Sequence, residues 1–105
     1  MKSRYQVSFT PRAEKDLADM YDFIARRSTP GRAIRYIGRI QKLCTSLKSF
    51  PQRGSRRDDI APGLRVIGFE RRVSIAFRVA PGQVTIARIL YGGRHLEGEL
   101  RDSES

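Results

Sequence analysis

The dipeptide Thr-Pro occurs twice, at residues 10–11 and 29–30, and each occurrence signals the start of a helix. Threonine can cap a helix with its side-chain oxygen, and proline suits the first helical position, where an N–H would have no partner anyway. Behind each signal the apolar residues recur at helical spacing: Ala13, Leu17, Met20, Tyr21 and Ile24, then Ala33, Tyr36, Ile37, Ile40, Cys44 and Leu47. The second helix should end near residue 48, because Phe50 precedes a proline. Two helices this close in sequence form an antiparallel hairpin.

Apolar runs on both sides of the helical pair indicate strands. They cover residues 4–9, 64–69, 73–79 and 84–91. Residues 80–83 form a turn between the last two runs, whereas residues 52–63 show no periodicity and are expected to be a connector.

The predicted element order is therefore β-α-α-β-β-β. This order predicts an α+β domain in which the helical hairpin packs on one face of a largely antiparallel four-stranded sheet. The opposite face is expected to be basic, because six arginines lie on or beside the strands: Arg65, Arg71, Arg72, Arg78, Arg88 and Arg94.

Length and composition bound the class of protein. A chain of 105 residues has room for one domain, expected at residues 1–97, followed by a short, flexible acidic tail at residues 98–105. No apolar stretch is long enough to span a membrane, no signal peptide is evident, and the single cysteine excludes a disulfide framework. We expect a cytoplasmic protein that needs no cofactor and no metal.

The net charge of +10 points to an acidic partner. Seventeen of the 21 basic residues are arginines, which favours forked contacts to carboxylate or phosphate. Between residues 23 and 57 there are ten basic residues and no acidic one.

Several short motifs, in this order and spacing, resemble the ParE/RelE superfamily of type II toxin–antitoxin toxins, and more closely its ParE branch. They are residues 9–13 with Asp16 and Leu17; Ala33, Tyr36 and Ile37; Phe50, Pro51 and Gly54; and residues 63–65, 73–79 and 88–94. The resemblance implies a cytoplasmic toxin neutralised by a cognate antitoxin. Its ParE branch implies inhibition of DNA gyrase, as in plasmid stabilisation systems, whereas the RelE branch implies ribosome-dependent cleavage of mRNA.

The catalytic set of the RelE branch is incomplete here. Arg65 stands where a lysine is expected, its next neighbour on the same face is Ile67, and Ser74 stands near the position of an arginine. The terminal segment, residues 96–105, contains no tyrosine. These gaps favour a protein that is not an enzyme. If it were a nuclease, the candidates would be His95 as general base, with Arg65, Arg94 and Tyr91.

Other chemically interesting residues have simpler explanations. Cys44 falls in an apolar helical stripe, which favours a buried, inert thiol. Asp58 and Asp59 are adjacent carboxylates without a third ligand, and they make a poor metal site.

A basic toxin is expected to bind an acidic, partly disordered antitoxin segment and so to form a hetero-oligomer with it. Arg32, Arg35 and Arg39, on the polar side of the second helix, are the predicted antitoxin contacts. Arg88, Arg94 and His95 are the predicted contacts to gyrase. Sequence-specific nucleic-acid binding is not expected, because no helix-turn-helix, zinc finger or stacking platform is evident.

Overall fold

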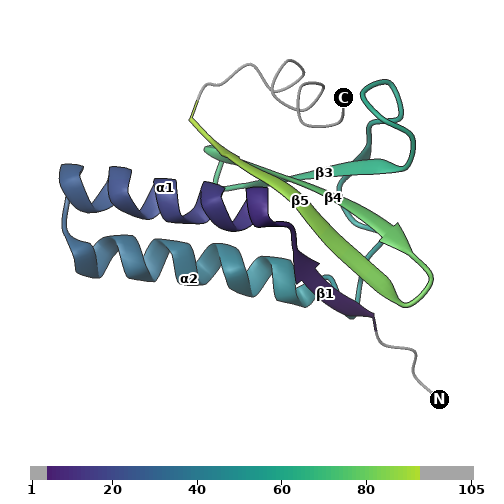
Figure 1. The fold of residues 1–105 in the computed structure, drawn as a ribbon, viewed down its shortest axis with the longest axis horizontal. Coiled ribbons are helices and arrows are strands. Elements are labelled where there is room, and N and C mark those ends of the chain that lie inside the picture. The colour runs from purple at the N-terminus through teal and green to yellow at the C-terminus, as the bar shows by residue number, and fades with distance from the viewer. Residues whose placement is uncertain (1–4, 93–105) are drawn as a thin grey trace.

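The computed structural model describes residues 5–92 and shows two helices packed on a five-stranded sheet (Figure 1). The elements follow in this order: β1 (Gln6–Phe9), α1 (Pro11–Arg27), α2 (Pro30–Ser46), β2 (Ser55–Arg56), β3 (Leu64–Phe69), β4 (Val73–Ala80) and β5 (Gln83–Tyr91). The helices run antiparallel, and their linked ends extend beyond the sheet. Within residues 5–92 no helix is both long and apolar enough to cross a membrane.

Both predicted helix starts are confirmed. The Thr10 side chain accepts a hydrogen bond from the N–H of Ala13 at 3.0 Å, and the Thr29 side chain accepts one from the N–H of Arg32 at 3.1 Å. The first cap also ties the helix to the sheet, because the Thr10 hydroxyl donates to the carbonyl of Ala87 at 3.0 Å. The second helix ends at Ser46, two residues before the predicted limit.

The strand order is β1-β5-β4-β3-β2. β1 pairs with β5 in parallel, and the other three pairings are antiparallel, as the sequence predicts for a largely antiparallel sheet. The prediction of four strands is wrong by one, since β2 adds a fifth at the far edge. A strand of two residues is too short to show any alternation. What makes it possible is Gly54, whose φ is +76° and whose absent Cβ would lie 2.4 Å from the Val66 carbonyl oxygen.

The core lies on both faces of the sheet. The main cluster fills the space between helices and sheet, with Ile40, Cys44, Phe77 and Ile86 fully buried. A smaller cluster covers the opposite face and contains Ile60, Ala61, Leu64, Ala76 and Leu90. This face is therefore not a purely basic surface, because the connector folds back over part of it and supplies two of the apolar side chains, Ile60 and Ala61.

Candidate functional site

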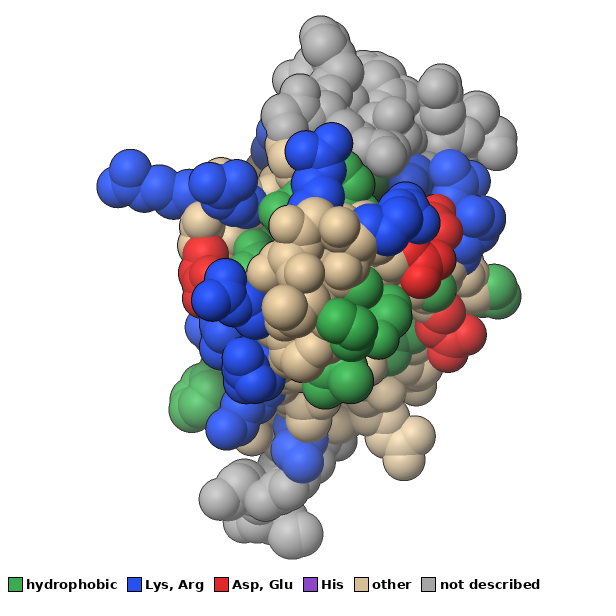
Figure 2. Space-filling view, turned by 90° about the vertical axis from the view of Figure 1, so that its left-hand side faces the viewer, with side chains coloured by type: hydrophobic (Ala, Val, Ile, Leu, Met, Phe, Trp, Pro, Cys, Tyr) green, Lys and Arg blue, Asp and Glu red, His purple; other side chains and the backbone are tan. Residues whose placement is uncertain are grey.

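A cleft of about 340 Å³ lies where the hairpin meets the end of the sheet, and we name it the arginine cleft. Its polar lining includes Arg32, Arg35 and Arg39 from α2, together with Arg72 and Glu70 from the β3–β4 turn; Ile24, Ser28, Tyr36 and Tyr91 complete it. The three α2 arginines share one face of the helix because they are spaced three and four residues apart. Basic side chains gather around this end of the molecule, as Figure 2 shows.

The arginine cleft holds four guanidinium groups and one carboxylate. Arg39 binds both oxygens of Glu70, at 3.1 and 3.2 Å, and the two side chains remain 53% and 47% exposed. Arg32 is within 3.4 Å of the Ser28 hydroxyl, a long contact. The cleft thus carries an excess of positive charge, because Glu70 is the one described carboxylate that lines it.

Four aromatic rings form a row, and the two in its middle, Tyr36 and Tyr91, line the cleft. Phe23 meets Tyr91 with ring centroids 5.6 Å apart, Tyr91 meets Tyr36 at 6.2 Å, and Tyr36 meets Phe69 at 5.6 Å, all edge to face. Arg39 lies 5.2 Å from the Tyr36 ring centroid, within cation–π range. Tyr36 from α2 and Tyr91 from β5 thus give the cleft an aromatic wall, which Phe23 and Phe69 support from either side.

Tyr36 keeps its proton. Its hydroxyl is buried and has no hydrogen-bond partner among residues 5–92. Burial raises the pKa of Tyr36 above its ordinary value, and nearby Tyr91 and Glu70 raise it further. A neutral phenol is therefore what lines the cleft beside Arg39.

The turn that carries Glu70 is strained. Glu70 and Arg71 have φ values of +50° and +62°, and the N–H of Arg72 donates to the carbonyl of Phe69 at 3.1 Å. Two positive φ values in a closed turn are typical of type I′, which favours Asn and Gly. A residue with a Cβ costs about 1–2 kcal/mol in this region, so the turn holds Glu70 at the cleft against its backbone preference.

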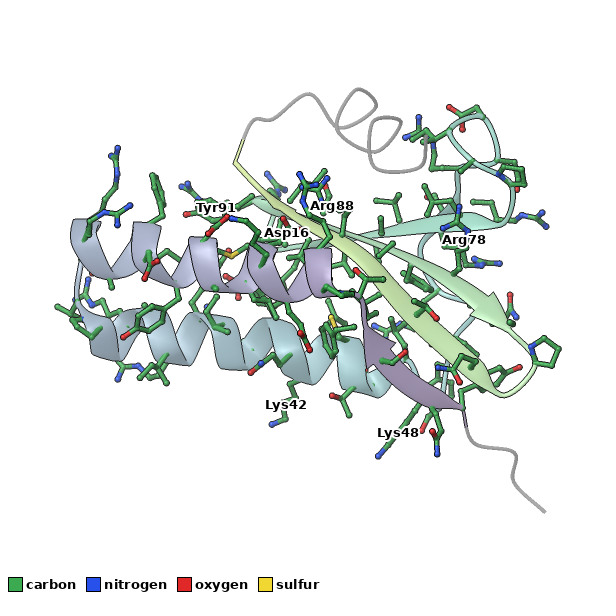
Figure 3. The ribbon with its side chains drawn as sticks, in the orientation of Figure 1. Asp16, Lys42, Lys48, Arg78, Arg88 and Tyr91 are labelled. Carbon is green, nitrogen blue, oxygen red and sulfur yellow. The ribbon has the colours of Figure 1, made fainter. Side chains whose placement is uncertain are left out.

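A second cleft, of about 420 Å³, runs between α1 and β5 and contains a buried ion pair. Asp16 accepts from Arg88 Nε at 2.8 Å and from Arg88 Nη2 at 3.1 Å, and also from the N–H of Ile89 at 2.9 Å. The side chains are only 11% and 2% exposed, and Figure 3 shows them side by side between helix and strand. Arg88 was predicted as a contact to the target, but it lies inside the protein and holds α1 to the sheet.

The described nuclease candidates do not share a site. Arg65 binds the Gln52 side chain at 2.8 Å and the Arg53 carbonyl at 3.2 Å. Arg65 pairs with Phe77 of β4, and Phe77 pairs with Ile86 of β5. Ile86 precedes Tyr91 by five residues, so Arg65 and Tyr91 are about 16 Å apart along the strand direction. Arg94 and His95 lie outside the described residues, as does the predicted tail at residues 98–105.

The contacts of Cys44, Asp58 and Asp59 indicate structural roles. Asp58 pairs with Arg56 at 3.0 Å and accepts from the N–H of Gly63, and Asp59 pairs with Arg57 at 2.9 Å. Within residues 5–92 no three histidine, cysteine or acidic side chains gather as metal ligands. Cys44 is fully buried, and burial raises the pKa of its thiol to about 12.

We expect the Cys44 thiol of the folded protein to resist alkylation at mildly alkaline pH. Only the thiolate reacts, and the raised pKa keeps the thiolate fraction far below that of a free cysteine. Mass spectrometry after a short exposure to iodoacetamide should show almost no adduct in buffer and complete modification in concentrated guanidinium chloride. Equal labelling in both conditions would contradict the buried position.

Sequence reasoning missed Glu70 and the role of Asp16. Asp16 follows Ala13 by three residues and precedes Met20 by four, so it falls on the buried stripe of α1, and an acid there signals a buried partner. Glu70 carries no such signal, because its contact with Arg39 joins residues 31 positions apart.

Comparisons with known proteins bear on the family of this chain and on its fold. The sequence profile of a family described as the ParE toxin of the type II toxin–antitoxin system parDE matches residues 7–96. A solved structure of a chromosomal ParDE toxin–antitoxin system from P. aeruginosa is similar with a TM-score of 0.75 and 26% identity, over 87% of this chain and 99% of that chain. The structure of the toxin–antitoxin complex RelBE2 from Mycobacterium tuberculosis shares the fold, with a TM-score of 0.61 and 19% identity, over 90% and 98% of the two chains. No curated protein sequence matches.

Proposed function

The chain belongs to the ParE toxins of type II toxin–antitoxin systems, and on that premise we propose that it inhibits DNA gyrase in the cytoplasm and is neutralised by a cognate antitoxin. It would do so by binding, with no catalytic step of its own. The family match over residues 7–96 is the observation that carries this proposal.

The separation of the nuclease candidates supports a toxin without catalysis. Cleavage of RNA needs a proton acceptor, a proton donor and cations around one phosphate. Arg65 and Tyr91 are separated by about 16 Å along the strand direction, and Tyr91 packs its ring between Phe23 and Tyr36. These two residues could not act on the same phosphate in this arrangement.

The arginine cleft is the proposed docking site of the antitoxin, and its lining supports this assignment. Arg32, Arg35 and Arg39 line one concave surface, joined there by Arg72. Guanidinium groups bind carboxylates through two parallel hydrogen bonds, so an acidic segment that is disordered when free would gain several such contacts on docking. The complex would be a hetero-oligomer of toxin and antitoxin.

Arg94 and His95 stay our proposed contacts to gyrase, since both follow the last strand. Arg88 is no longer part of that proposal, because a contact with a target would require it to leave Asp16.

Two parallel assays test the proposed function: supercoiling of a relaxed plasmid by DNA gyrase, and cleavage of a defined mRNA on programmed ribosomes. We expect the purified protein to abolish supercoiling and to leave the mRNA intact. Arg94→Ala and His95→Ala should each reduce the inhibition of gyrase, and the folding of each variant should be checked by circular dichroism. Cleaved mRNA with unaffected gyrase would overturn the proposal in favour of a RelE-like endonuclease.

A further inference from the structure

Among the described residues, Glu70 is the one acidic side chain that lines the arginine cleft. Glu70 occupies Arg39 with both carboxylate oxygens, while Arg32, Arg35 and Arg72 line the cleft around them. We propose that Glu70 is an internal substitute for a carboxylate of the antitoxin, and that an Asp or Glu side chain of the antitoxin takes its place on Arg39 when the complex forms. This inference rests on the proposed docking of the antitoxin in the arginine cleft.

The Arg39–Glu70 pair is suited to exchange. Both side chains are about half exposed, so water and salt screen their attraction and the pair contributes little to folding. A partner that brings its own carboxylate with a larger interface can therefore displace Glu70 at small cost. The Asp16–Arg88 pair is the contrary case, because both of its members are largely buried and separating them would be costly.

The backbone at Glu70 favours the same conclusion. A positive φ is poorly suited to glutamate, whereas asparagine or glycine would close the turn with less strain. The turn therefore does not require a glutamate for its own geometry. Its carboxylate, by contrast, has a definite effect on the cleft, where it offsets one of four positive charges.

Charge determines how such a substitute acts on binding. While Glu70 stays in the cleft it repels an approaching carboxylate and occupies one of the guanidinium groups that would receive it. Removing the charge should therefore speed association with an acidic partner, and the gain should shrink as salt is added.

The test measures binding of the antitoxin encoded beside this chain to the toxin and to its Glu70→Gln variant, by surface plasmon resonance over a range of salt. We expect Glu70→Gln to bind about two- to fivefold more tightly at low salt, mainly through faster association. Glu14→Gln is the matched control, since it removes the same charge from an exposed position in the first turn of α1 and should leave the affinity unchanged. Glu70→Asn provides a second variant that suits the positive φ and lacks the charge.

A double-mutant cycle separates displacement from a merely structural role. If Glu70 blocks Arg39, the gain from Glu70→Gln should be clearly smaller when Arg39 is already replaced by glutamine, since only the repulsion of the approaching carboxylate then remains. If Glu70 instead only holds Arg39 in position, Glu70→Gln should weaken binding, and the proposal is overturned.

The other outcomes also decide. Suppose that Glu70→Gln and Glu70→Asn bind equally or more weakly, while an Arg32→Glu, Arg35→Glu variant binds more weakly. The proposal that Glu70 is an internal substitute is then overturned, but the proposed docking site stands. If none of these changes alters binding, the antitoxin does not dock in the arginine cleft, and this inference fails with the docking site. Tighter binding of Glu70→Gln to duplex DNA but not to the antitoxin would mean that the arginine cleft takes phosphate, and would equally overturn the proposal.

Discussion

Replacement of Asp16 by alanine should lower the free energy of unfolding by about 3–5 kcal/mol, and the melting temperature by at least about 12 °C. The change takes the Asp16 carboxylate away from the Arg88 guanidinium, which is 2% exposed, and removes the acceptor for the N–H of Ile89. A domain of this size is stable by only about 5–15 kcal/mol, so much of that margin would be lost. Urea unfolding followed by circular dichroism measures it.

Asp19→Ala is the matched control for this prediction. Asp19 pairs with Lys15 at 3.1 Å on the same helix, but the side chains are 64% and 68% exposed, and the loss should stay below about 0.5 kcal/mol. The double variant Asp16→Ala, Arg88→Met should recover stability relative to Asp16→Ala alone, because it removes the buried charge that Asp16 balanced. Equal losses for Asp16→Ala and Asp19→Ala would refute the structural role of the buried pair.

The double charge reversal Arg32→Glu, Arg35→Glu should weaken binding of the antitoxin about 100-fold, if each reversal costs about 1.4 kcal/mol. Two attractive contacts become repulsive in the proposed docking cleft, so association should slow and dissociation should quicken. The measurement is again surface plasmon resonance with the proposed cognate antitoxin.

Lys42→Glu, Lys48→Glu is the control for that reversal. It changes the net charge by the same amount at two lysines that do not line the arginine cleft, and both are labelled in Figure 3. We expect at most a small loss of affinity, one that fades with added salt. If both double variants weaken binding equally, the effect comes from the overall charge of the protein and not from the cleft.

Local rules predict most of this fold. The Thr10 and Thr29 caps, the two helical stripes and the three long strands follow from spacing and turn chemistry within about ten residues of each position. The two-residue strand β2 could not be found this way, because it depends on Gly54 meeting the carbonyl of Val66 across the sheet.

The candidate site is less predictable, because its chemistry depends on contacts between distant parts of the chain. Arg32, Arg35 and Arg39 share a helix face, and their grouping follows from the sequence alone. Arg88, however, has the same residue type as the surface arginines, and only its approach to Asp16, 72 positions away, shows that it is buried. Glu70 escaped notice for the same reason.

The parallel pairing of β1 with β5 has a consequence for how this protein is made. Residues 6–9 are synthesised long before residues 83–86, with which they pair in parallel. The arginine cleft also forms late in synthesis, since its wall includes Tyr91. A nascent chain that stops short of residue 83 therefore lacks the pairing of β1 with β5, and one that stops short of Tyr91 lacks part of the wall of the proposed docking cleft.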